Sequence, residues 1–286
     1  MNGYELPYSQ VPERLKQLAS PPKRLFHAGT ELSQLLQRPT VAIVGSRKVT
    51  PYGRQVTTKL ARELAEQGVV IVSGLAIGVD GLAHEAALEA GGLTIAVLPS
   101  PIEQVMPRGH VQLAQRILDG GGALISEYPD GMPALRQNFV IRNRLVAGLC
   151  DALLVTEAAL KSGSLHTANF CLEQGKDVLA VPGNITNPIA EGTNNLIRDG
   201  ATPVTCTEDV LNVLQLRFKT ITPLKVAEGA TSYEQAVIDL LKTGLTDAEE
   251  LQRASKLAIA AFNQTMTMLE LSGKIRPLGA NNWALS

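Results

Sequence analysis

Small residues with free backbone N–H groups recur in this chain directly after short apolar runs, and arginine and lysine lie among them. Such turns bind anions where they open a helix, because the first N–H groups of a helix have no partner within it. A single turn of this kind is more often a tight connection between a strand and a helix. Several turns that meet at one edge, with basic side chains among them, favour phosphate binding. The residues concerned are Gly45, Ser46, Arg47, Ser73, Gly74, Gly78, Lys161, Ser162, Gly163 and Ser164.

Residues 136–144 form the densest polar and basic stretch of the chain, and one aromatic residue, Phe139, lies inside it. Arg142, Asn143 and Arg144 open a segment that continues into an apolar run. Such a cluster is suited to binding single-stranded nucleic acid, because the basic side chains contact phosphates while unpaired bases stack on aromatic rings. The other interpretation is an ordinary start of a helix that buries Phe139 in the core.

No set of catalytic residues stands out. Asp80 and His84 have the spacing of one helical face and could pair, but no recognisable nucleophile turn and no suitably spaced third metal ligand accompany them. We expect Asp80 to hold the turn at residues 73–76 by a hydrogen bond, and Glu157 to order a loop. The loop after Val44 lacks the G-x-G-x-x-G pattern, and the chain has no Walker A motif. We therefore expect a protein that is not an enzyme and has no metal and no cofactor.

The elements that must position these residues begin at Val41. From there to about residue 215, short apolar runs alternate with longer segments of helical spacing. Apolar strands between amphipathic helices indicate a parallel sheet covered on both faces. We predict a Rossmann-like, doubly wound, mainly parallel α/β sheet, whose ligands bind outside the carboxyl ends of the strands. The expected strands are 41–44, 69–73, 94–98, 123–126, 152–156 and 178–182, and the expected helices include 55–67, 79–90 and 165–174.

The pattern changes after Leu216. Three segments then have helical spacing, the second opened by a capping box of Thr246 and Glu249, and the tail predicts two strands. Three helices and a hairpin are typical of a winged helix. The expected helices are 233–242, 246–253 and 256–273. The expected organisation is an N-terminal extension at 1–40, a Rossmann-like domain at 41–216, a linker at 217–231 and a winged-helix-like domain at 232–286.

Composition and charge limit the functions that fit. Hydrophobic residues make up 45% and charged residues 19%, as is ordinary for a globular protein. The net charge of −1 argues against a polybasic protein, so any contact with nucleic acid must come from a local cluster. No apolar run is long enough to span a bilayer, and the N-terminus lacks the apolar core of a signal peptide. Three widely spaced cysteines favour a reducing compartment, so we expect a cytoplasmic protein without a membrane contact.

Six sequence blocks resemble the DNA-processing protein A (DprA/Smf) family in their order and spacing. They run from about Val41 to Ala201, more than half of the chain. The tail after Tyr233 is similar to the winged-helix-like module at the end of that family, whereas its N-terminal sterile-alpha-motif-like domain is expected to be absent or reduced to the first 40 residues. The blocks read VAIVGSR, VSGLAIGVDGLAHEAAL, LISEYPDG, FVIRNRLVAGL, TEAALKSGSLHTANFCLEQGKDVLAVPGN and EGTNNLIRDGA.

The resemblance implies a protein that binds single-stranded DNA at the carboxyl ends of the strands. It also implies that the protein protects incoming single strands during natural transformation, helps to load the RecA recombinase and works as a homodimer. We expect Arg47, Arg142 and Arg144 to contact phosphates. The DNA-contacting residues that the resemblance carries over are Gly45, Ser46 and Arg47, the stretch 73–78, Arg142, Asn143 and Arg144, and Ser162, Gly163 and Ser164.

The chain departs from the family pattern in two places. Val140 stands where the family usually has proline, and Met106 and His110 replace a usual tyrosine and asparagine, which puts the loop at 100–110 in doubt as a contact surface. The third helix of the tail carries little charge besides Lys256 and Glu270, so we expect residues 233–286 to contact protein or to have a regulatory role, and not to bind duplex DNA.

An alternative class of function is a nucleotide phosphoribohydrolase of Rossmann-like architecture. The PG and SG turns after the late strands resemble those of the lysine-decarboxylase-like nucleotide phosphoribohydrolases. Those enzymes carry PGGxGTxxE, in which a glutamate follows the phosphate loop. Here KSGSLHTANF occupies that place without the glutamate. The sequence therefore argues against hydrolysis.

Overall fold

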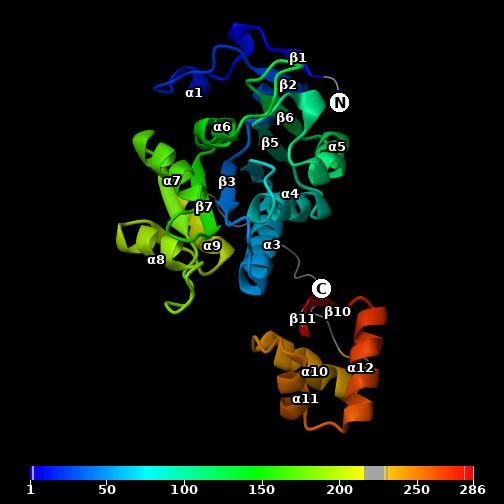
Figure 1. Cartoon of the computed structure of the whole chain (residues 1–286). Helices are drawn as coiled ribbons and strands as arrows, with labels where there is room; N and C mark the ends of the chain where they lie inside the picture. The colour runs from blue at the N-terminus through cyan, green and yellow to red at the C-terminus, as the bar shows by residue number, and fades with distance from the viewer. Residues whose placement is uncertain (2, 216–228, 230, 280, 286) are drawn as a thin grey trace. The chain divides into compact units, whose positions relative to one another are not determined.

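The computed structural model describes residues 1, 3–215, 229, 231–279 and 281–285. The chain divides into two compact units, Met1–Lys219 and Thr220–Ser286, and each is considered by itself (Figure 1). The expected linker at 217–231 lies outside the described residues, apart from residues 229 and 231.

A nine-stranded sheet forms the centre of the first unit, in the order β1-β2-β6-β5-β4-β3-β7-β8-β9. Strands β3 to β9 are parallel, whereas β2 runs antiparallel to β6, and β1 antiparallel to β2. The six predicted strands are all present, as β3 to β8. The bounds are β1 Tyr4–Glu5, β2 Phe26–Gly29, β3 Thr40–Gly45, β4 Val70–Ser73, β5 Thr94–Leu98, β6 Ala123–Ser126, β7 Ala152–Glu157, β8 Asp177–Ala180 and β9 Thr202–Pro203.

Both faces of the central strands are buried, which explains why their sequences are continuously apolar. In β3, Val41 and Ile43 pack on one face with α3, α4 and α9, while Ala42 and Val44 pack on the other with α6 and α7. The doubly wound arrangement predicted from the sequence is confirmed. The helices are α1 Glu13–Lys16, α2 Leu32–Leu35, α3 Pro51–Glu66, α4 Val79–Glu89, α5 Val111–Asp119, α6 Arg136–Leu149, α7 Ser164–Glu173, α8 Glu191–Arg198 and α9 Thr207–Val213, with 3-10 turns at Tyr8–Gln10, Ile102–Gln104 and Arg108–His110.

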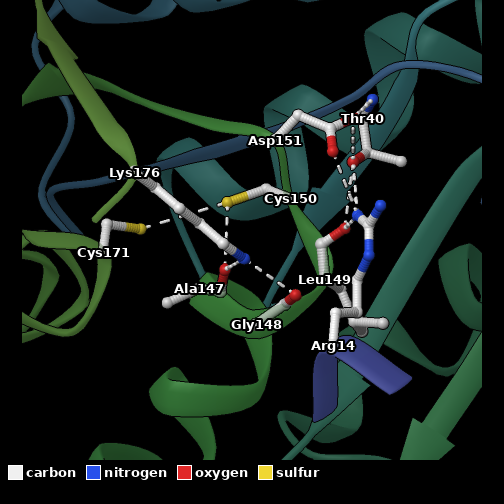
Figure 2. A network of polar contacts seen from close by, with 9 residues as sticks. All are labelled: Arg14, Thr40, Ala147, Gly148, Leu149, Cys150, Asp151, Cys171 and Lys176. Carbon is white, nitrogen blue, oxygen red and sulfur yellow. Dashed lines mark hydrogen bonds and ion pairs between the residues drawn. The ribbon is translucent and has the colours of Figure 1, made fainter. Parts of the chain in front are cut away.

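The first 40 residues add β1, β2, α1 and α2 to this unit. Leu15 and Leu25 are fully buried in the same core cluster as the strands. Arg14 fixes the segment further, because its Nη1 donates a hydrogen bond to the carbonyl of Leu149 at 2.9 Å and lies 3.2 Å from the carboxylate of Asp151 (Figure 2). Asp151 in turn accepts a hydrogen bond of 2.8 Å from the backbone of Thr40. These contacts join the N-terminal segment, the start of β3 and the end of α6.

A lysine caps the other side of the same helix end. Nζ of Lys176 donates to the carbonyls of Ala147 and Gly148 at 2.6 and 2.9 Å (Figure 2). The last carbonyls of a helix have no partner within it and carry partial negative charge, so a lysine there is favourable. Cys150 and Cys171 lie beside this contact as free thiols, with their Sγ atoms 4.0 Å apart. Helix α6, which carries the predicted basic stretch, is therefore held firmly at its carboxyl end.

The second unit contains α10 Ser232–Lys242, α11 Ala248–Ser255, α12 Ile259–Leu271 and the hairpin β10 Ile275–Gly279 with β11 Asn282–Leu285. The predicted order of three helices followed by a hairpin is confirmed. The predicted capping box at the start of the second of these helices, α11, is wrong. Asp247 is the residue that caps α11, through hydrogen bonds from the N–H groups of Glu249 and Glu250. The hydroxyl of Thr246 donates instead to Asn282 of the hairpin.

Candidate nucleic-acid interface

A cavity of about 490 Å³ opens at the carboxyl ends of β3 and β7, beside α6 and the start of α7. Its volume is typical of small-ligand sites. The cavity brings together five segments that lie far apart in the sequence. The predicted residues that line it are Gly45, Ser46, Arg47, Phe139, Arg142, Asn143, Lys161, Ser162, Gly163 and Ser164.

The loop from β3 to α3 supplies two exposed cations to this cavity, Arg47 and Lys48. Neither has an ion-pair partner within the described residues. The Arg47 guanidinium lies over the ring of Phe139, 5.1 Å from its centroid. Phe139 is half-buried and lines the cavity. Ser46 orders the loop, because its Oγ accepts a hydrogen bond of 3.0 Å from the backbone of Lys48. The positive charge of Arg47 and the aromatic ring of Phe139 thus lie next to each other at the cavity.

Glu157, at the end of β7, fixes where α3 begins. Its carboxylate accepts hydrogen bonds from the N–H and the hydroxyl of Thr50, at 2.8 and 2.5 Å. Thr50 caps α3 through a bond from Gly53, and a Cβ atom at Gly53 would collide with the Glu157 carboxylate. The sequence-based prediction that Glu157 orders a loop is confirmed.

Arg142 is a buried cation at the wall of the cavity. Only 3% of the residue is exposed, and Nη1 donates to the carbonyl of Val97. Within the described residues Nε has no hydrogen-bond partner and no carboxylate lies within ion-pair distance of the guanidinium. Burial lowers the pKa of Arg142 to about 10, while the charge of Asp80 opposes this shift. A buried charge without a close partner is costly, so an anion that enters the cavity would be favoured.

The sequence predicts that the loop after β4 offers backbone N–H groups to an anion, but two of these groups are already engaged within the protein. Asp80, in the first turn of α4, already accepts hydrogen bonds from the backbones of Gly74 and Ala76, at 3.1 and 3.4 Å. Its carboxylate occupies the position that an external anion would take. Burial raises the pKa of Asp80, and the charge of Arg142 opposes that rise. Asp80 holds the turn as predicted, but it pairs with backbone and not with His84, whose Nδ1 bonds Thr94 at 2.6 Å.

Three predicted residues of this loop therefore have structural roles in the described chain. Ser73 is fully buried, and its hydroxyl donates to the carbonyl of Ile43. Gly74 packs against Arg142. Gly78 has a φ of +91°, and a Cβ there would collide with the backbone of Ser46. None of the three lines the cavity.

Arg144, which the sequence predicts to contact a phosphate, does not line this cavity. Its Nη1 and Nη2 donate to the two carboxylate oxygens of Glu127, at 2.5 and 2.6 Å, and Nε donates to the carbonyl of Ser20. The side chains of Arg144 and Glu127 are only 11% and 13% exposed. The guanidinium is thus engaged in a bidentate pair with Glu127.

The turn before α7 completes the site. The hydroxyls of Ser162 and Ser164 lie 2.7 Å apart, and Asn143 donates to the carbonyl of Gly163 at 3.2 Å, which joins α6 to this turn. Lys161 is exposed and has no ion pair within the described residues. With the N-terminus of α7 beside them, these groups suit a phosphate.

Sequence reasoning missed several residues that line the cavity. The charge of Lys48 beside Arg47 is visible in the sequence, within a basic stretch at 45–62 that also suits a solvated helix face, whereas Ile189 carries no signal of its own. No residue of the doubtful loop at 100–110 lines the cavity; His110 instead contacts the carbonyl of Leu75 at 2.9 Å.

Comparison with known proteins identifies the family. The model of the family described as DNA recombination-mediator protein A matches residues 7–215. The chain belongs to this family. The model of the DprA winged helix domain matches residues 223–281.

Several DprA and Smf proteins resemble the chain closely. It is 49% identical over 175 residues to Protein Smf of Escherichia coli, a match that covers 61% of this chain and about half (47%) of that relative. It is 38% identical over 217 residues to DNA processing protein DprA of Bacillus subtilis, covering 76% of this chain and 72% of the relative.

Two solved structures of the family share its fold. DprA of Streptococcus pneumoniae has a TM-score of 0.68 and 38% identity, over 76% of this chain and 75% of the other. DNA processing protein A of Helicobacter pylori, whose structure concerns its single-stranded DNA binding mode, has a TM-score of 0.67 and 35% identity, over 74% and 95%.

The nucleotide phosphoribohydrolase alternative is not favoured for this member of the DNA recombination-mediator protein A family. Asp80, the carboxylate among the described lining residues, is engaged with two backbone N–H groups. Over the described residues, no helix is long and apolar enough to cross a membrane. The same part of the chain contains no group of three or more His, Cys, Asp or Glu side chains able to hold a metal ion.

Proposed function

We propose that this chain binds single-stranded DNA in the cavity at the carboxyl edge of the sheet, as a recombination mediator that does not itself catalyse a reaction. The observation that carries the proposal is Arg142, a buried guanidinium without an ion pair in the described chain, at the wall of a cavity lined by further cations. A site of this kind is built for an anion.

The chemistry of the lining fits a nucleic-acid backbone. Arg47, Lys48 and Lys161 supply charge for phosphates, and Ser162 and Ser164 supply hydroxyl donors. Phe139 offers a ring on which an unpaired base can stack. A duplex keeps its bases paired and stacked, so the aromatic contact favours single strands.

The family resemblance supports four further parts of the proposal. The protein protects incoming single strands, helps to load a RecA-type recombinase during natural transformation, works as a homodimer and acts in the cytoplasm. Two copies on one strand would raise the affinity through avidity, which suits the small number of cations in each cavity. Sedimentation equilibrium of the full chain tests the dimer, and recombinase loading on covered single strands tests the mediator role.

The experiment that tests DNA binding is fluorescence anisotropy with labelled oligothymidine and a matching duplex over a salt series. The unaltered chain is compared with Arg47→Ala and with the control Arg38→Ala. Arg38 is exposed and precedes β3, at the amino end of that strand, whereas the cavity lies at its carboxyl end. We expect a preference for single strands that Arg47→Ala weakens, with a salt slope reduced by roughly 0.7 for the lost phosphate contact. Arg38→Ala should bind normally. Binding that is indifferent to Arg47, or that is equal for the duplex, would refute the proposal.

A further inference from the structure

Tyr52 lies beside the cavity without lining it. It belongs to the first turn of α3, four residues after the cavity residue Lys48. Four residues of extended chain span at most about 15 Å, which limits the distance between the backbones of Lys48 and Tyr52. A DNA strand that leaves the cavity can therefore reach Tyr52 within a few nucleotides. The tyrosine is 49% exposed. A large ring is thus offered to solvent next to the proposed phosphate site.

The ring of Tyr52 is held in place although it is exposed. Its hydroxyl donates a hydrogen bond of 2.9 Å to the carbonyl of Pro182, at the loop after β8. Its helix begins at a fixed point because Glu157 binds Thr50. A ring that is already positioned loses little conformational entropy when a partner packs on it.

The other exposed tyrosines of the described first unit differ from Tyr52 in having ring partners. Lys16 lies over the ring of Tyr8, 5.2 Å from its centroid, and Tyr4 makes an edge contact with the ring of His27. Tyr4 lies in β1, the first strand in the order of the sheet, and Tyr8 lies in the 3-10 turn that follows it in the chain. Within the described residues, the Tyr52 ring makes no ring or cation contact.

We propose that Tyr52 is a second base-stacking platform, which receives an unpaired base within a few nucleotides of the one whose phosphate lies in the cavity. This inference rests on the proposed DNA binding and deepens it. Phe139, covered on one face by Arg47, holds one base at the cavity, and Tyr52 holds another outside it. Stacking does not depend on base identity, since every base has an aromatic face. Two such platforms would select single strands over duplexes without selecting a sequence.

The test compares labelled oligothymidine with an abasic oligonucleotide of the same length over a salt series. The variants are Tyr52→Ala, Tyr52→Phe and the control Tyr8→Ala, each checked for an unchanged thermal transition. We expect Tyr52→Ala to weaken oligothymidine binding by roughly 5- to 150-fold, the range for loss of one stacked base. The salt slope should not change, because no phosphate contact is lost. Tyr52→Phe should restore most of the affinity, and Tyr8→Ala should match the unaltered chain.

The abasic strand separates stacking from a structural role. Tyr52→Ala should bind it as tightly as the unaltered chain does, because no base is present to stack. Equal loss on both strands, or no loss on either, would overturn the platform while leaving the DNA-binding proposal in place. If the unaltered chain binds neither strand, the DNA-binding proposal fails, and the platform fails with it.

Discussion

The guanidinium of Arg142 packs directly on the backbone of Gly74, so closely that a Cβ atom at position 74 would overlap its atoms. The contact joins α6 to the loop after β4 and fixes one wall of the cavity. Glycine is required here for the close approach, because nothing larger than hydrogen fits between the loop and the arginine.

Replacing that glycine should therefore damage the site. We expect Gly74→Ala to lower the free energy of unfolding by about 1–3 kcal/mol through overpacking, and to weaken binding of oligothymidine as Arg142 is displaced. Denaturant unfolding and anisotropy measure the two effects. Gly109→Ala is the matched control, since a Cβ atom at that position meets no atom within 4 Å. Equal stability of the two variants would contradict the predicted overlap.

Arg144 should act on stability and not on DNA contact. Its bidentate pair with Glu127 is largely buried, so Arg144→Met leaves an unpaired buried carboxylate and should cost about 3–5 kcal/mol of unfolding free energy. The salt slope of DNA binding should stay unchanged, because no phosphate contact is removed. Arg24→Ala, which breaks the exposed pair with Glu5, should leave stability nearly unaltered. A lower slope for Arg144→Met would restore its predicted phosphate contact.

The central strands could be predicted because both faces of each are buried, which leaves a continuous apolar run in the sequence. Strands β1, β2 and β9 could not, since they lie at or near the edges of the sheet, and β1 and β9 have only two residues each. Burial of Leu15 and Leu25 within the first 40 residues depends on tertiary packing and leaves no regular period.

The candidate site shows a similar division. Residue types and their order placed Arg47 and Ser162 at the cavity, because turns after parallel strands meet at one edge. Arg142 and Arg144 look equivalent in sequence, yet residues two apart on a helix point about 200° away from each other. One therefore lines the cavity while the other pairs with Glu127. The hydrogen bond from the backbone of Gly74, in the loop after β4, to Asp80 is seen only in the three-dimensional structure.

The exposed lysines of the cavity should determine much of its salt dependence. We expect the double variant Lys48→Ala with Lys161→Ala to reduce the salt slope of oligothymidine binding by roughly 1.4, or 0.7 for each lost phosphate contact. The control replaces Lys23 and Lys59, which are exposed but do not line the cavity. Anisotropy over the same salt series measures both. An equal change of slope in the control would mean that general charge and not this cavity binds the strand.

Buried histidines should make the chain less stable in mild acid. His84 is fully buried and bonds Thr94, and burial lowers its pKa from 6.5 to about 3. In the unfolded chain it binds a proton below about pH 6.5, but in the folded chain it does not until about pH 3. His84 therefore leaves stability unaffected above pH 6.5 and lowers it by about 1.4 kcal/mol per pH unit below that. Burial lowers the pKa of His27 as well, so its contribution has the same sign.

The variant His84→Asn isolates this contribution. The asparagine amide can still donate to Thr94, so the hydrogen bond is kept while the titrating group is removed. Urea unfolding between pH 7.5 and pH 4 should show a shallower loss of stability for the variant than for the unaltered chain, whatever their difference at neutral pH. Parallel pH curves for the two proteins would mean that His84 is not the group that titrates.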